Sequence, residues 1–194
     1  MGRPRILALA GSTRAESFNR KLLRIAVAAA EGAGAEVAVL DLKDFALPLY
    51  DGDDEAAHGL PEPAIRLRAA IRAHDGLLIA APEYNGGLSA VLKNALDWTS
   101  RAHAGEPQLA VFAGKAAALL SASITAYGGV RSLIQLRAVL TAMRVLVLPE
   151  QFALPLAAQA FGPDGALTNP RQQANVTDLA GRFVALLARL KGGS

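Results

Sequence analysis

The stretch R-I-L-A-L-A-G-S-T-R-A-E-S-F-N, residues 5–19, places a short apolar run directly before a polar loop. A continuous apolar run of this length is typical of a strand that is buried on both faces in a parallel sheet. Beyond the loop, apolar residues return at helical spacing from Leu22 to Ala30, and Gly32 and Gly34 end the pattern. The stretch therefore predicts a strand, a polar loop and a helix, in that order.

The same alternation continues to the end of the chain. Apolar runs predict four further strands, over residues 36–42, 75–81, 115–121 and 144–148. Helical spacing predicts helices over 61–73, 90–101 and 129–143, and a closing helix that begins at Pro170 with Asn169 as its N-cap. Residues 43–62 show no period, and we expect them to be irregular. This order predicts a mostly parallel sheet with helices on both faces.

The composition excludes several classes of protein. The 194 residues are 52% hydrophobic and contain no cysteine, which predicts one soluble globular domain over 1–194 without disulfides or thiolate chemistry. The longest charge-free stretch, 116–130, is too short and too polar to span a bilayer. The apolar run 6–10 is shorter than a secretory signal requires, so we expect a cytoplasmic protein. No basic run interleaved with aromatic residues indicates a nucleic-acid partner.

The loop after the first strand has the composition of an anion-binding site. Ser12, Thr13, Ser17 and Asn19 supply hydroxyl and amide donors, and Arg14 adds a positive charge just before a helix N-terminus. These side chains suit a terminal phosphate better than a bridging pyrophosphate, which glycine-rich loops bind through bare backbone. In the alternative interpretation, Ser17 or Asn19 is an ordinary helix cap and Arg14 is solvated.

The loop after the third strand, 81–87, reads A-P-E-Y-N-G-G. Asn85-Gly86 would favour a hairpin, but the helical pattern that follows leads us to interpret the segment as a strand-to-helix turn. Its N–H groups could bond the edge of a flat heterocycle, with Tyr84 beside it. In the alternative interpretation the segment is simply a turn, and Trp98 lies in the core or at an interface.

The residue spacing gives little support for a metal site or for a serine hydrolase. His58 lies near an acidic cluster, 51–55, but the spacing matches no metal-ligand motif, so we interpret this segment as a solvated loop and expect no metal site. The G-x-S-x-G turn of a serine hydrolase does not occur in the sequence.

The two loops together resemble the NADPH-dependent FMN reductase family, which includes chromate- and quinone-reducing flavoproteins. The resemblance rests on G-S-T-R-x-x-S-F-N at 11–19, P-E-Y-N-G at 82–86 and L-K-N-A-L-D-W at 92–98. It extends over nearly the whole chain, through P-L-Y-D at 48–51, A-G-K at 113–115 and Gly128-Gly129. This chain departs from the family at Thr125, where a glycine is common, and at Ser89, where a proline is frequent.

The resemblance implies a flavodoxin-like fold, with a doubly wound five-stranded parallel sheet and helices on both faces, that binds FMN non-covalently. The residues implied to bind the cofactor are Ser12, Arg14, Glu16, Ser17, Phe18 and Asn19 in the first loop, Pro82, Glu83, Tyr84, Asn85 and Gly86 in the second, and Ser121 and Ser123 after the fourth strand. No catalytic acid or base is expected, because the cofactor carries the chemistry.

We therefore expect an oxidoreductase that moves a hydride from NADPH or NADH to FMN and then reduces a quinone, an azo compound, a metal oxyanion or free flavin. A flavodoxin-type one-electron carrier and a non-catalytic flavin-binding sensor or scaffold are the alternatives. The resemblance also implies a homodimer or homotetramer with the flavin near the subunit boundary, and the helix that carries Trp98 offers an apolar face for such contacts.

Overall fold

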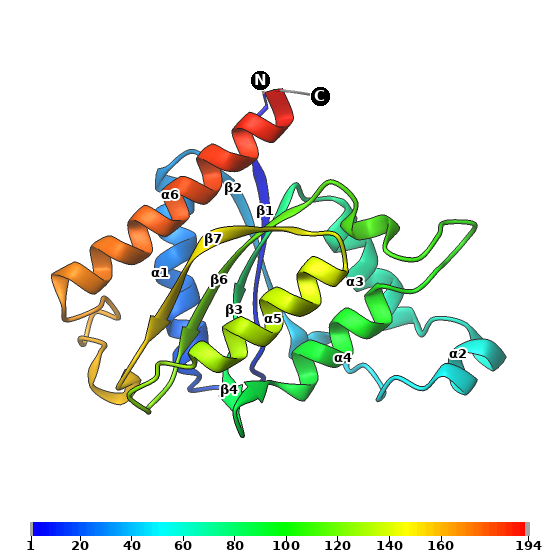
Figure 1. Cartoon of the computed structure of the whole chain (residues 1–194), viewed down its shortest axis with the longest axis horizontal. Helices are drawn as coiled ribbons and strands as arrows, with labels where there is room; N and C mark the ends of the chain where they lie inside the picture. Colours follow the sequence, from blue (N-terminus) through cyan, green and yellow to red (C-terminus); the bar gives the residue numbers. More distant parts are fainter. Residues whose placement is uncertain (1, 193–194) are drawn as a thin grey trace.

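A computed structural model describes residues 2–192 and contains one central sheet of five strands. The strands are β1 (Arg5–Ala10), β2 (Glu36–Asp41), β3 (Gly76–Ala80), β6 (Ala116–Ala122) and β7 (Leu146–Leu154). They lie in the order β2-β1-β3-β6-β7, and every neighbouring pair is parallel (Figure 1). Counted along the sheet, this is the order 2-1-3-4-5 of doubly wound flavodoxin-like folds. The predicted fold class is confirmed.

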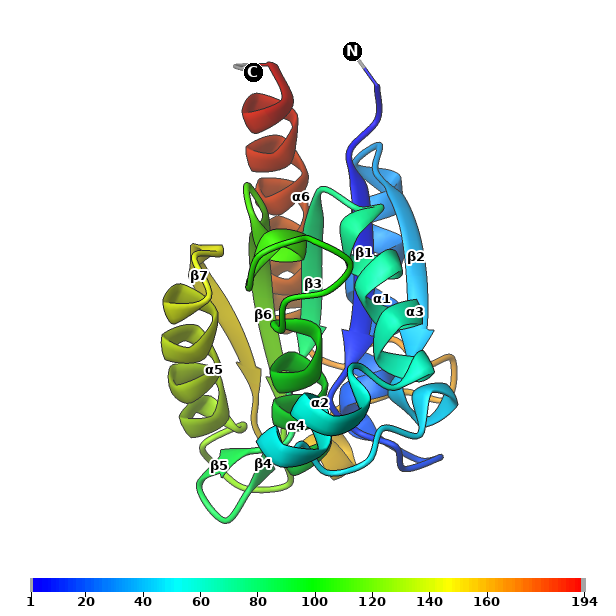
Figure 2. The ribbon, with the colours of Figure 1, turned by 90° about the vertical axis from the view of Figure 1, so that its right-hand side faces the viewer.

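Helices cover both faces of the sheet, as Figure 2 shows. One face carries α1 (Phe18–Gly32) and α6 (Pro170–Gly192). The other face carries α3 (Glu62–Arg72), α4 (Ala90–Thr99) and α5 (Val130–Ala142). Within residues 2–192, no helix combines the length and the apolar character needed to cross a membrane.

The sequence of the central strands explains this layering. Side chains alternate along β1, so that Ile6, Ala8 and Ala10 pack under α1 and α6, while Leu7 and Leu9 pack under α3 and α4. All five residues of β3 are buried, which is why apolar runs without polar interruptions predicted these strands. Phe183 of α6 is fully buried against the sheet, and burial of such a ring contributes about 1.5–3 kcal/mol.

The last strand is longer than the sequence predicted. The strand expected over 144–148 is present, but its predicted end is wrong, because β7 begins at Leu146 and continues through Pro149 to Leu154. The pairing register with β6 shifts between Ala117 and Leu119, which pair with Val147 and Gln151, so residues 148–150 of β7 form a bulge opposite Ala118. Proline is tolerated here because β7 is an edge strand. Arg137 of α5 donates to the carbonyl oxygens of Leu148 (2.9 Å) and Pro149 (3.2 Å) at this bulge.

The segment 43–62 is more ordered than expected. It contains the end of a 3₁₀ turn, η1 (Leu42–Phe45), and a short helix, α2 (Gly52–His58), whose N-cap is Asp51. The cap explains the helix, which the absence of an apolar period had hidden, because α2 has no buried residues.

Trp98 packs under this segment. Its Nε1 donates to the carbonyl oxygen of Pro48 (2.8 Å), and its ring lies edge-on to Tyr50. Trp98 is 2% exposed, so it belongs to the core and does not form an exposed apolar face.

Candidate functional site

The loops after β1, β3 and β6 meet at the carboxyl ends of these strands, where doubly wound sheets bind their ligands. They enclose a cleft of about 310 Å³. Nine of the thirteen residues predicted to bind the cofactor line it, together with Ala122, Ile124 and Thr125: Ser12, Arg14, Ser17, Phe18, Asn19, Pro82, Glu83, Tyr84 and Ser123.

The first loop presents hydrogen-bond donors at the start of α1. Ser17 is the N-cap, and its Oγ accepts from the N–H of Arg20 at 3.4 Å. The N–H groups of Phe18 and Asn19 lie in the first turn, where no intrahelical acceptor is available to them. Ser12 is buried, whereas Arg14 is exposed beside it. This is a helix N-terminus with added hydroxyl groups and a guanidinium, an arrangement suited to a phosphate.

Ser89 holds this loop in place. Its Oγ donates to the carbonyl oxygen of Gly11 at 2.6 Å and, as the N-cap of α4, accepts from the N–H of Leu92 at 3.4 Å. Ser89 is 2% exposed. Ser89 was not predicted to have this role and stood out only as a departure from the family, although a serine just before an apolar helical pattern is a recognisable N-cap signal.

Asn19 points to a different partner from the one its position in the loop suggested. Its side-chain amide donates to the carbonyl oxygen of Ala122 (2.8 Å) and accepts from the N–H of the same residue (3.0 Å). Asn19 is 4% exposed, so both hydrogen bonds are shielded from water. Asn19 therefore joins α1 to the end of β6, and its side chain retains at most one N–H for a phosphate.

The second loop is a hairpin. The strands β4 (Glu83–Tyr84) and β5 (Gly87–Leu88) pair antiparallel, and Asn85 and Gly86 between them have φ values of 50° and 79°. Two consecutive left-handed residues are typical of a two-residue type I′ turn. The interpretation as a strand-to-helix turn is therefore wrong, because α4 begins only at Ala90, after the hairpin has closed.

Glu83 carries a buried carboxylate into the wall of the cleft. The side chain is 5% exposed and forms an ion pair with Arg131 of α5, which is 53% exposed. Both the backbone N–H (3.1 Å) and Nε (2.8 Å) of Arg131 donate to this carboxylate. The hydrogen bond to Glu83 and its charge raise the pKa of Arg131. Arg131 was not among the predicted site residues, since nothing in the sequence links residues 48 positions apart.

The end of β6 contains a buried polar atom without a partner. Within residues 2–192, Ser121 Oγ is the buried side-chain oxygen or nitrogen that lacks a hydrogen bond. A Cβ atom at Gly129, which has a φ of 86°, would lie 2.0 Å from this oxygen, so only glycine fits there. Ser121 is 0% exposed and does not line the cleft, so the fit to a phosphate-bearing cofactor rests on the donors at the start of α1 and on Arg14.

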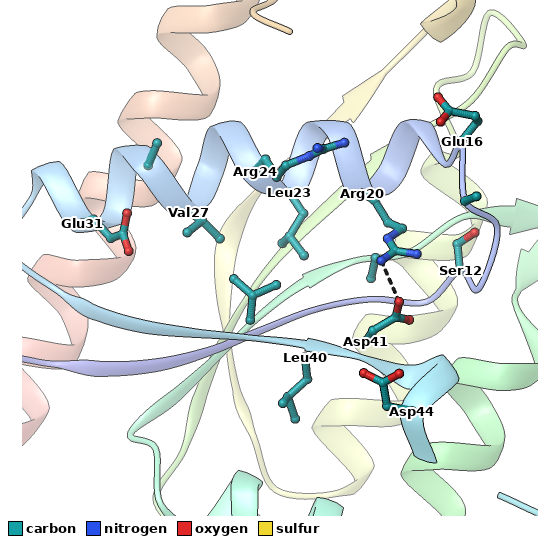
Figure 3. A pocket seen from close by; sticks show the side chains of 14 residues that line it. Ser12, Glu16, Arg20, Leu23, Arg24, Val27, Glu31, Leu40, Asp41 and Asp44 are labelled. Atoms are coloured by element: carbon teal, nitrogen blue, oxygen red, sulfur yellow. Dashed lines mark hydrogen bonds and ion pairs between the residues drawn. The ribbon is translucent and has the colours of Figure 1, made fainter. Parts of the chain in front are cut away.

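Four predicted residues lie outside the lining of the cleft. Ser121 is buried next to Ala122, and Asn85 and Gly86 form the tip of the hairpin. Glu16 pairs with Lys21 (3.1 Å) and lines a separate cavity of about 700 Å³ between α1 and β2. Figure 3 shows this cavity, in which Arg20 reaches Asp41 at the end of β2.

A doubly wound sheet with a phosphate-type loop and a hairpin at the ends of its central strands defines the class of flavodoxin-like flavoproteins. Residues 4–159 match the model of the NADPH-dependent FMN reductase family, and the chain belongs to that family. It is accordingly an oxidoreductase that uses FMN and NAD(P)H.

Individual relatives agree with this assignment. The chain is 34% identical over 189 residues to an NAD(P)H-dependent FMN reductase of Pseudomonas aeruginosa, covering 97% of each chain. It is 36% identical over 193 residues to a probable NADPH:quinone oxidoreductase of Oryza sativa, covering 97% of this chain and 91% of the relative. The solved structure of FerB, a flavoenzyme NAD(P)H:(acceptor) oxidoreductase from Paracoccus denitrificans, superposes with a TM-score of 0.80 at 26% identity, covering 96% and 98% of the two chains.

Proposed function

We propose that this chain transfers a hydride from NAD(P)H to FMN bound in the cleft and passes the electrons to a small acceptor. Quinones are the acceptors that we favour, ahead of azo compounds, metal oxyanions and free flavin. The observation that carries the proposal is a cleft that joins a phosphate-type loop to an exposed apolar rim. In that rim, Tyr84 is 49% exposed and Ile124 is 65% exposed. Flat, apolar acceptors gain from contact with such side chains.

The residues of the chain would bind and orient, because FMN supplies the redox chemistry when bound. Ser12, Arg14 and Ser17 would hold the phosphate, with the first N–H groups of α1. The hairpin backbone would lie along the ring system, where its polar groups can bond the ring edge. Ser123 would close the opposite wall of the cleft, beside Ala122.

One face of the ring would stay open to the nicotinamide. Phe18 and Tyr84 are the two aromatic residues among those that line the cleft. The Phe18 ring is stacked on Phe161, with centroids 6.1 Å apart and planes at 5°, so it is held toward the loop before α6. With a single free aromatic side chain at the rim, a nicotinamide ring has room to approach at hydride-transfer distance.

Anaerobic stopped-flow spectroscopy of the FMN-loaded protein tests this proposal. We expect NADPH or NADH to bleach the flavin band in a single two-electron phase, and benzoquinone to restore it. If neither nucleotide reduces the flavin while a separate reductase does so in one-electron steps, the chain is a carrier. If no donor reduces it, the chain is a binding module.

For the assembly, we propose a homodimer or homotetramer. Exposed apolar side chains away from the cleft support self-association: Leu49 is 81% exposed, Ile134 59% and Leu146 50%. Sedimentation equilibrium at low micromolar concentration checks this, and a mass of 20.1 kDa at every concentration would contradict it. Because NAD(P)H is held inside cells, we place the activity in the cytoplasm.

A further inference from the structure

The first two turns of α5 hold the hairpin along its whole length. Ser132 Oγ donates to the carbonyl oxygen of Ala81 (2.9 Å), just before the hairpin. Gln135 Nε2 donates to the carbonyl oxygen of Gly86 (3.2 Å), and its Oε1 accepts from the N–H of Leu88 (3.3 Å). Figure 2 shows β4 and β5 below the lower end of α5. The segment that would flank the flavin therefore takes its position from this helix.

The ion pair between Glu83 and Arg131 is the charged contact between the hairpin and α5. Glu83 is the one acidic residue among the described residues that line the cleft. Its carboxylate accepts from the backbone N–H, Nε and Nη2 of Arg131. The Arg131 guanidinium also lies 5.4 Å from the ring centre of Tyr127, in the loop after β6, at a distance typical of a cation–π contact. The carboxylate is buried, whereas its counter-ion is half exposed and has no other acidic partner within residues 2–192.

A charge at this place bears on how easily the flavin is reduced. A hydride adds two electrons and one proton to the neutral oxidised ring, so the ring gains one negative charge. An unpaired carboxylate in the low-dielectric wall would repel that charge, whereas in the ion pair the guanidinium charge offsets most of this repulsion. The presence of Arg131 therefore determines how strongly the Glu83 carboxylate opposes reduction of the flavin.

We propose that Arg131 is a positioning residue that neutralises Glu83 and, with Ser132 and Gln135, fixes the hairpin, so that this pair sets the reduction potential of the bound FMN. The inference rests on the proposed function only in requiring that FMN lie in this cleft. Neither residue needs to touch the reacting atoms, and a purely structural role would not shift the potential in opposite directions in the two single variants.

The test measures midpoint potentials of the FMN-loaded proteins by dye equilibration, at about pH 8 so that a free carboxyl group stays ionised. Arg131→Gln leaves the Glu83 charge uncompensated, and we expect it to weaken the preference for reduced over oxidised FMN about tenfold, or about 30 mV toward negative potential. Glu83→Gln leaves the Arg131 charge, and we expect the opposite sign. The double variant should return to within about threefold of the wild-type preference. Arg171→Gln, at an exposed position in α6, is the matched control.

Each outcome has a defined meaning. Opposite shifts in the two single variants and recovery in the double variant support the inference. An unchanged potential in Arg131→Gln, or a negative shift in Glu83→Gln, overturns it, and the second variant decides if the first does not fold. If neither the wild type nor the Arg171→Gln control binds FMN, seen as unquenched flavin fluorescence, the result would instead reject the proposed function.

Discussion

Replacing Asn19 by alanine distinguishes two roles for this residue. In the structure its side-chain amide pairs with both the N–H and the carbonyl group of Ala122, at 3.0 and 2.8 Å. If that pairing is its main role, the loss appears in the protein without any ligand. If Asn19 serves chiefly as a phosphate ligand, the ligand-free protein keeps its stability and only FMN binding suffers.

The size of the effect follows from the burial of the pair. Alanine leaves one backbone donor and one acceptor of Ala122 without partners, and each such group costs about 1–3 kcal/mol when buried. Because the neighbouring cleft lets water reach part of the site, we expect the free energy of unfolding to fall by about 2–4 kcal/mol. Urea denaturation of the apo-protein, followed by circular dichroism, measures this as a lower midpoint at an unchanged slope.

Two further variants sharpen the result. Asn175→Ala, on the exposed side of α6, is the control and should change the stability by no more than about 0.5 kcal/mol. Asn19→Asp keeps the acceptor but places a carboxylate against the carbonyl oxygen of Ala122. Its folded-state pKa should lie above its unfolded value, so stability should return as the pH falls below about 4 and be lost as the pH rises. An Asn19→Ala apo-protein within about 0.5 kcal/mol of wild type would refute the reasoning.

Three other changes have definite expected outcomes. Arg14→Ala should weaken FMN binding about ten- to hundredfold and riboflavin binding hardly at all, since a charge-assisted hydrogen bond contributes about 1.5–3 kcal/mol; titrating both ligands into the apo-protein checks this, and equal losses would remove Arg14 from the phosphate. Ser89→Ala removes the cap of α4 and the bond to Gly11, and should lower the unfolding free energy by about 1–3 kcal/mol in urea, with no change as the contrary result. Burial would raise the pKa of Asp75, but hydrogen bonds from Lys191 and a backbone N–H lower it overall, so the carboxylate contributes stability above its ordinary value of 3.8 and loses it as the pH falls through the lower folded value. Asp75→Asn should therefore destabilise at about pH 7 and much less at about pH 3, and an equal deficit at both would contradict this assignment.

The fold could be predicted because parallel strands buried on both faces leave a clear trace in the sequence. In β1 and β3 nearly every residue is apolar, so an interval of polar residues marks each end. The apolar pattern does not predict a strand correctly where burial along the strand is interrupted. At Pro149 the edge strand bulges and goes on, although a proline normally ends a strand. In the hairpin, each strand has two residues, which is too short for any period to show.

The position of the site could also be predicted, since ligands of doubly wound sheets lie at the carboxyl ends of the strands. The partners of its side chains could not. Asn19 and Ala122 are 103 residues apart, and Ser89 and Gly11 are 78 apart. Such contacts depend on how α1 and α4 pack on the sheet, and the residue types alone give no sign of them. Polar residues near a ligand loop were therefore assigned to the ligand, although the Asn19 side chain bonds the backbone at the end of β6 and the Glu83 carboxylate accepts from the backbone N–H of Arg131 in α5.

The bulge in β7 also limits how copies of this chain can associate. A regular outer strand offers a row of free N–H and C=O groups on which a foreign strand can assemble, a frequent start of aggregation. On this side of the sheet, Pro149 has no N–H to offer, and the Arg137 guanidinium already occupies the carbonyl groups of Leu148 and Pro149. Growth of the sheet past β7 is thereby blocked at its middle. Stable contacts between copies on this side must then use side chains, which can be matched to one partner, rather than backbone, which accepts any strand.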